Sequence, residues 1–243
     1  MGKLQAKDRI IIPLDMSADQ ASQVISQLAG KVGYFKIGLE LLMATGPDHF
    51  VRLAHEAGAK VFLDGKFSDI PNTVASATSV IASMGVEMID VHANCGRAAL
   101  MAAVKAKGNT KILAVTVLTS LENKDTQELY GKPVTEVVKA FALMAVECGV
   151  DGIVCSAQEV RMIRGDPALS RMLIVTPGIR PDWADSGDQK RAVTPREAIV
   201  AGADLLVIGR PITSPPAKVG SALEAVKLIV EEIEAGLKER GEV

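Results

Sequence analysis

The chain has 243 residues, of which 48% are hydrophobic and 23% are charged, and its formal net charge is −2. This length suits one large α/β domain, and the hydrophobic share is enough for a sizeable core, which excludes a disordered chain. The near-neutral charge and the aromatic share of only 3% argue against a nucleic-acid-binding protein, which needs a basic face and stacking rings.

Short apolar runs recur along the chain, and each is followed by a turn and a stretch with helical periodicity. We expect strands at residues 9–14, 34–37, 60–63, 88–91, 112–117, 152–155, 173–175 and 205–208. These runs are nearly continuously apolar, which is typical of parallel strands buried on both faces. Between them we expect helices such as residues 19–28, with Ser17 as the N-cap and Gly30 at the end, and residues 221–240 form the last helix.

Eight strand–helix units in a chain of this length indicate a (β/α)8 TIM barrel, with residues 1–243 forming a single domain. A doubly wound open sheet is the lesser alternative. No apolar run approaches the roughly 20 residues that a membrane span needs, and no signal-peptide core follows the basic N-terminus. We therefore expect a cytoplasmic protein that makes no contact with a membrane.

The cysteines and histidines do not show the spacing of metal ligands. Cys95, Cys148 and Cys155 lack a C-x-x-C pair. His49 and His55 are six residues apart, which does not place them on one face of a helix. We therefore expect reduced thiols and no metal site.

Polar side chains follow nearly every expected strand. They are Asp15, Lys36, Asp64, Lys66, Asp69, His92, Asn94, Thr116, Thr119, Ser120, Ser156, Arg180 and Arg210. A TIM barrel builds its active site at the carboxyl ends of its strands, whereas an ordinary surface would scatter such residues. The pattern therefore favours an enzyme.

Charged residues are densest after the third expected strand, in the segment Asp64-Gly65-Lys66-Phe67-Ser68-Asp69. In an extended chain, positions 64 and 66 project to the same side, and Lys36 comes from the neighbouring strand. We expect two ammonium groups and two carboxylates to meet at one mouth of the barrel. An ion-pair network that only holds loops together is the alternative, but desolvating four charges is costly without excellent pairing.

The neighbouring carboxylates favour the protonated form of Lys66. A protonated lysine is a poor Schiff-base nucleophile, which argues against a class I aldolase, the natural rival for a lysine in a barrel. The same lysine is a good proton donor.

A phosphate site is expected after the last two strands, where many barrels bind phosphate. Gly209 leaves its backbone N–H open to an anion, and Arg210 offers a planar fork of donors, although Gly-Arg-Pro is also a common turn. The polar stretch at residues 180–191 is long enough to close as a lid. From it, Gln189 can reach a phosphate.

The segment Asp64-x-Lys66-x-x-Asp69-Ile70-Pro71-Asn72-Thr73 resembles the signature of the orotidine 5′-monophosphate decarboxylase family. Further matching strings, in order, are Phe35-Lys36-Ile37-Gly38, Val175-Thr176-Pro177-Gly178-Ile179-Arg180, Gly187-Asp188-Gln189 and Ile208-Gly209-Arg210-Pro211. The resemblance runs along the whole chain and fits the shorter bacterial form. It implies decarboxylation of the nucleotide substrate orotidine 5′-monophosphate to UMP, the final step of pyrimidine nucleotide synthesis, without a cofactor.

The resemblance also implies roles for the charged residues. Lys66 would protonate C6 of the pyrimidine as carbon dioxide leaves, and Asp64 would hold Lys66 near the departing carboxylate. Lys36 would bridge the ribose and the acidic pair. Asp69, Ile70 and Thr73 resemble residues that reach into the partner subunit's site, which implies a homodimer.

The remaining roles concern substrate binding. By resemblance, Asp15 would bind a ribose hydroxyl and Thr119 the pyrimidine. The phosphate would be held by Gln189, Gly209 and Arg210, with Arg180 at the hinge of the closing loop. We expect His92 to support the fourth strand.

Two other functions stay open. Related barrels with a D-x-K-x-x-D run resemble metal-dependent sugar-phosphate decarboxylases or synthases, but those have an acidic residue where this chain has Lys36. A non-catalytic phosphate sensor would keep Gly209 and Arg210, but it would not need the charged residues after the second and third strands.

Overall fold

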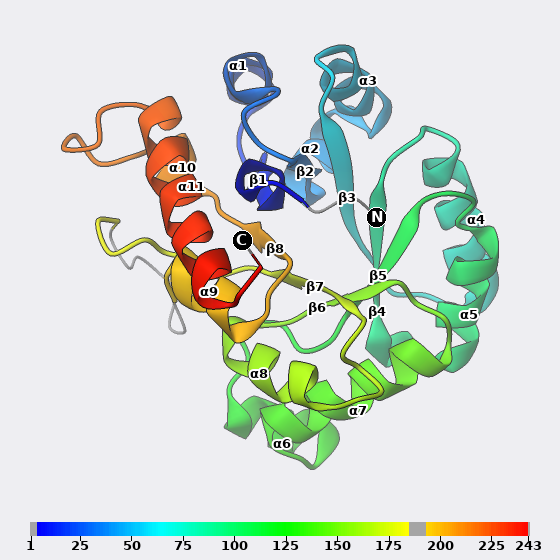
Figure 1. Cartoon of the computed structure of the whole chain (residues 1–243). Helices are drawn as coiled ribbons and strands as arrows, with labels where there is room; N and C mark the ends of the chain where they lie inside the picture. Colours follow the sequence, from blue (N-terminus) through cyan, green and yellow to red (C-terminus); the bar gives the residue numbers. More distant parts are fainter. Residues whose placement is uncertain (1–3, 185–192, 243) are drawn as a thin grey trace.

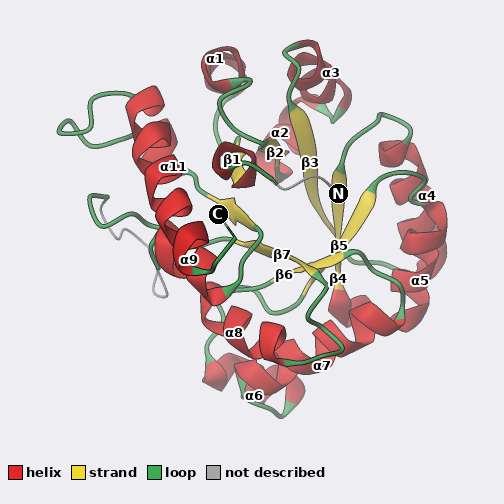
Figure 2. Cartoon of the chain, viewed as in Figure 1, coloured by secondary structure: helices red, strands yellow, loops and turns green. Residues whose placement is uncertain are grey.

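The computed structural model describes residues 4–184 and 193–242. Parallel strands pair in chain order and close into a barrel, because β8 pairs with β1. The strands are β1 (Ile10–Pro13), β2 (Tyr34–Ile37), β3 (Lys60–Phe67), β4 (Met88–His92), β5 (Lys111–Val115), β6 (Gly152–Val154), β7 (Leu173–Thr176) and β8 (Leu205–Val207). Figure 2 shows them at the centre of the molecule with helices around them. The expected TIM barrel is confirmed, and the open sheet is wrong.

Helices connect the strands around the outside of the barrel (Figure 1). They are α1 (Ala18–Leu28), α2 (Leu39–Thr45), α3 (Asp48–Glu56), α4 (Pro71–Ala82), α5 (Arg97–Ala106), α6 (Asn123–Tyr130), α7 (Val134–Glu147), α8 (Ala157–Gly165), α9 (Pro195–Ala201), α10 (Arg210–Thr213) and α11 (Ala222–Glu239). The short 3₁₀ helices η1 (Ala6–Arg9) and η2 (Ala93–Cys95) precede β1 and follow β4.

The helix ends follow the expected capping chemistry. Ser17 precedes α1, and its backbone N–H donates to the side chain of Gln20 at 3.3 Å. The helix ends at Leu28, just before Gly30, which has a φ of +73°. Before α11, the Ser221 hydroxyl accepts from the Glu224 backbone N–H at 3.2 Å.

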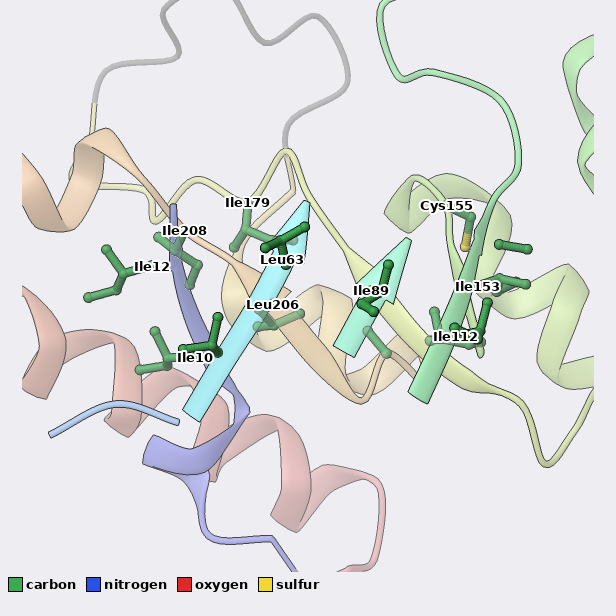
Figure 3. Close-up of a cluster of buried hydrophobic side chains, with 14 of the residues drawn as sticks. Ile10, Ile12, Leu63, Ile89, Ile112, Ile153, Cys155, Ile179, Leu206 and Ile208 are labelled. Carbon is green, nitrogen blue, oxygen red and sulfur yellow. The ribbon is translucent and has the colours of Figure 1, made fainter. Parts of the chain in front are cut away.

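The alternation of side chains along the strands divides the apolar core into two layers. One cluster, which fills the barrel interior, consists of Ile11, Phe62, Met88, Leu113, Val175 and Leu205. The other lies between the barrel and its helices. Figure 3 shows part of it, including Ile10, Ile12, Leu63 and Ile89 from the alternate strand positions. Because side chains alternate, Lys36, Asp64 and Asp90 share the interior face with Tyr34, Phe62 and Met88.

The chain before β1 packs at the amino end of the barrel. Leu4 contacts the interior apolar cluster. Arg9 is buried beside β1 and donates to Glu242 at 3.1 Å and to the Asp204 carbonyl at 3.2 Å, which ties the first strand to the end of the chain.

Candidate active site

A pocket of about 470 Å³ opens at the carboxyl ends of the strands. Its wall combines acidic, basic and hydroxyl side chains with apolar residues such as Phe62 and Val115. The residues expected from the sequence that line it are Asp15, Lys36, Asp64, Lys66, Thr119, Arg180, Gly209 and Arg210. Six strands and the segments that follow them contribute these residues, so only closure of the barrel brings them together.

Five charged side chains form an alternating chain along one side of this pocket. Lys36 Nζ lies 3.1 Å from Asp15 Oδ1 and 3.0 Å from Asp64 Oδ2. Lys66 Nζ donates to Asp64 Oδ1 and, at 2.8 Å, to Asp90 Oδ2. Lys36, Asp64 and Asp90 are buried, and a buried charge is costly unless it is paired. Each of these three charges is paired, so the network can persist inside the barrel.

The backbone of Lys66 is unusual. Strand β3 runs past the expected end at residue 63 to Phe67, and its register against β4 shifts between Leu63 and Phe67. Within this shift, Lys66 has a φ of +50°, a left-handed conformation that is rare for a residue with a side chain. Such a conformation costs about 1–3 kcal/mol and persists where the surrounding structure fixes it. Here the Lys66 N–H donates to Asp90 Oδ1 at 2.9 Å.

Two further groups near this network are uncharged. His92 ends β4, and burial together with the positive charge of Lys66 lowers its pKa below the ordinary value. Cys155 lines the pocket and is buried, which raises the pKa of its thiol. A protonated thiol is not a nucleophile. Lys66 and the carboxylates are therefore the groups on this side of the pocket that can take part in a reaction.

A second part of the pocket wall is strongly basic. Arg180 follows β7, and burial together with the nearby charge of Arg210 lowers its pKa below the ordinary value. Arg210 is the first residue of α10 and is preceded by Gly209, where a Cβ would approach Pro13 Cγ to 3.1 Å. Two neighbouring guanidinium groups suit a phosphate, because each offers several N–H donors in a planar fork.

This geometry agrees with the comparison to known protein families. The model of the Orotidine 5'-phosphate decarboxylase / HUMPS family matches residues 8–225. The chain belongs to this family.

Individual members of the family are similar over nearly their whole length. The orotidine 5'-phosphate decarboxylase of Moorella thermoacetica is 44% identical, and the match covers 96% of this chain and 95% of the relative. That of Syntrophomonas wolfei is 43% identical, with 95% and 100% covered. The crystal structure of orotidine 5'-phosphate decarboxylase from Lactobacillus acidophilus has a TM-score of 0.78 at 30% identity and covers 93% of this chain and 99% of that one.

Three of the expected site residues do not line the pocket of the single chain. Asp69, Ile70 and Thr73 are exposed where β3 leads into α4. The Asp69 carboxylate accepts the Ile70 N–H at 2.7 Å, just before α4 begins. Within the single chain, the second carboxylate beside Lys66 is Asp90, and Asp69 does not line the pocket. The reach of these three residues into a partner's site stays a prediction, and Gln189 lies outside the described residues.

Sequence reasoning missed Asp90. Polar residues were sought where strands end, whereas Asp90 lies inside β4 between Ile89 and Val91. The available signal was a lone acid within an apolar strand, because a buried carboxylate requires a partner.

Clusters of metal-binding side chains and membrane-spanning helices are absent from residues 4–184 and 193–242. Within these ranges, no group of three or more His, Cys, Asp or Glu side chains could hold a metal ion. In the same ranges, no helix is long and apolar enough to span a bilayer. Activity without a metal or cofactor stays a prediction.

Proposed function

We propose that this chain decarboxylates orotidine 5′-monophosphate to UMP without a metal or cofactor. The observation that carries the proposal is the position of Lys66, whose ammonium group lies between Asp64 and Asp90 in a pocket that also contains Arg180 and Arg210. Relatives named orotidine 5'-phosphate decarboxylase, more than 40% identical over nearly the full chain, support the same reaction.

The reaction breaks the bond between C6 of the pyrimidine and its carboxylate. Carbon dioxide leaves, and the electron pair of that bond stays on C6 as a carbanion that the ring delocalises poorly. The Lys66 ammonium stabilises this charge and then transfers a proton to C6, after which the amine takes up a proton from solvent. Since the fixed charges of Lys66 and its partners replace an electron sink, the step needs no cofactor.

Repulsion between Asp64 and the substrate carboxylate is too weak to drive the reaction alone. Ground-state strain supplies about 1–5 kcal/mol, whereas enzymes on difficult reactions lower the barrier by roughly 8–23 kcal/mol. The remainder must come from stabilisation of the carbanion by Lys66 and from binding energy at the phosphate, which orients the ring.

The substrate would lie across the pocket with its two ends recognised differently. Arg180, Gly209 and Arg210 would hold the phosphate, together with Gln189. Asp15 and Lys36 would bind the ribose hydroxyls, and Thr119 would contact the pyrimidine. These assignments place the scissile bond beside Asp64 and Lys66.

We further propose that the working unit is a cytoplasmic homodimer. Apolar side chains are exposed near the mouth of the pocket, with Ile70 at 66%, Leu39 at 52% and Met43 at 80%. They follow the neighbouring strands β2 and β3, and Asp69 and Thr73 accompany them. A partner that covers the apolar side chains would bring Asp69 to the other subunit's pocket.

Mixing two inactive variants tests the dimer. Lys66→Ala and Asp69→Ala subunits, unfolded and refolded together, should regain activity, because each mixed dimer has one site with both residues intact. A monomer by analytical ultracentrifugation, or no recovery in a confirmed mixed dimer, would contradict the shared site.

The reaction itself is tested with purified protein, orotidine 5′-monophosphate and EDTA. Loss of the substrate's ultraviolet absorbance, with UMP as the product, is expected. No loss from the folded protein would refute the proposal. Activity on a sugar phosphate that appears only with magnesium would support the metal-dependent alternative.

A further inference from the structure

We propose that Asp90 is a positioning residue for Lys66, and that its single carboxylate fixes both the backbone and the ammonium group of the proton donor. This inference rests on the proposed decarboxylation, because it assigns Lys66 as the donor. It adds a residue that is separated from the Asp64–Asp69 segment and belongs to the next strand.

The two oxygens of Asp90 have different partners on the same lysine. Oδ1 accepts the Lys66 backbone N–H at 2.9 Å, and Oδ2 accepts from Lys66 Nζ at 2.8 Å. Asp90 lies on β4, the strand that pairs with β3 (Figure 1), and it faces the barrel interior in phase with Met88. One side chain therefore holds Lys66 at both ends.

Contact at both ends restricts Lys66 more than an ordinary ion pair does. A lysine side chain has four flexible bonds, and a contact at its tip alone leaves many arrangements open. Here the left-handed backbone at φ +50° sets the direction in which the side chain leaves β3, and Asp90 Oδ1 holds that backbone. Asp90 Oδ2 then holds the tip, in addition to the contact that Nζ makes with Asp64.

The second anchor matters during the reaction. Asp64 binds Lys66 and Lys36 together, and the substrate carboxylate must approach this same region. When the substrate disturbs the contact between Asp64 and Lys66, Asp90 still holds the ammonium group. The donor therefore stays aimed at C6 while the carboxylate leaves.

The burial of Asp90 argues against a role limited to the fold. Asp90 has 0% exposure. Among the described residues, Lys66 is the only one that forms a salt bridge with Asp90. A buried ion pair is often no more stabilising than apolar residues of the same size. The side chain of Lys66 keeps 28% exposure toward the pocket, so the pair presents its charge to a ligand.

The direct test is Asp90→Asn, which keeps the size of the side chain. The substitution replaces one of the two carboxylate oxygens by an NH2 group, which only donates, so either the backbone N–H or Nζ loses the acceptor that it faces. We expect kcat to fall on the order of 100-fold, with KM within about threefold of the wild type, because the donor is misplaced while substrate binding is retained. A kcat within about threefold of the wild type, at equal melting temperature, would overturn the proposal.

Asp151→Asn is the matched control. Asp151 also accepts one backbone N–H, that of Ile112 at 2.8 Å, and one lysine ammonium, that of Lys107. It precedes β6 at the amino end of the barrel, opposite the pocket. We expect Asp151→Asn to change the melting temperature but to leave kcat and KM unchanged.

A melting experiment without substrate separates this inference from the proposed reaction. Lys66→Ala leaves the Asp90 carboxylate buried without a cation, so the double variant Lys66→Ala/Asp90→Asn should melt at a higher temperature than Lys66→Ala alone. A lower melting temperature of the double variant would contradict the pairing, and this comparison remains decisive if Asp90→Asn alone does not fold. An inactive wild type would refute only the decarboxylation.

Discussion

The ammonium group of Lys36 lies 3.0 Å from Asp64 Oδ2, and the other oxygen of the same carboxylate accepts from Lys66. Asp64 therefore joins one lysine from β2 to another from β3. The side chain of Lys36 is 10% exposed and that of Lys66 is 28% exposed. Because the first lysine is enclosed and the second faces the pocket, the two should respond differently to substitution.

Lys66→Ala should abolish turnover while the protein remains folded. The variant lacks both the positive charge that stabilises the C6 carbanion and the proton that quenches it. Product formation is measured over long incubations, with circular dichroism and UMP binding as checks on the folded site. Activity within about tenfold of the wild type would refute the role of Lys66 as donor.

Lys36→Met should lose both stability and activity. The substitution removes the buried cation between Asp15 and Asp64, and breaking a buried ion pair costs up to about 3–5 kcal/mol. Urea denaturation gives the free energy of unfolding. Lys132→Met is the control, because its pair with Glu136 is 3.8 Å long and largely exposed, so its loss should cost less than about 1 kcal/mol. An equal decrease in the free energy of unfolding in Lys36→Met and Lys132→Met would contradict the prediction.

Arg210→Ala should raise KM for orotidine 5′-monophosphate by more than about tenfold, which corresponds to about 1.4 kcal/mol of binding energy. The guanidinium group is expected to hold the phosphate, whereas the groups beside C6 stay in place. Steady-state kinetics give KM and kcat separately, and kcat reports on the groups beside C6. Arg196→Ala serves as the control, since Arg196 pairs with Glu239 on the exposed side of α9 and α11. An unchanged KM in Arg210→Ala would exclude a phosphate contact.

Glu232 makes the stability depend on pH. Burial raises the pKa of this carboxyl from 4.5 to about 7, and the charges of Asp182 and Glu197 add to the increase. The folded state therefore binds the proton more tightly than the unfolded state, and stability falls as the pH rises from about 4.5 to about 7. Glu232→Gln should raise the melting temperature above pH 7 and have little effect below pH 4.5.

Melting curves of the wild type and Glu232→Gln from pH 4 to pH 8 check this prediction. The exposed neighbour Glu231, on the same helix, provides the control Glu231→Gln. A melting-temperature difference between Glu232→Gln and the wild type that is the same at every pH would contradict the link to this carboxyl.

Most of the barrel could be predicted because local sequence carries the necessary information. Buried parallel strands are short apolar runs, so the range expected for β2 matches the observed strand and the others differ at their ends by a few residues. The end of β3 is the largest difference. Residues 64–66 are polar or small, yet the strand continues through them to Phe67, with a shift of register against the neighbouring strand β4.

The sequence by itself determined the succession of strands and helices, and it placed Lys36, Asp64 and Lys66 near the carboxyl ends of strands. Only the tertiary structure decided which carboxylates surround Lys66. Asp69 is three residues from it in the chain but is exposed and does not line the pocket, whereas Asp90 is 24 residues away and lies 2.8 Å from its ammonium group. The reason is physical. Side-chain alternation is local, but the register between β3 and β4, and the curvature that closes the barrel, depend on the packing of all the strands together.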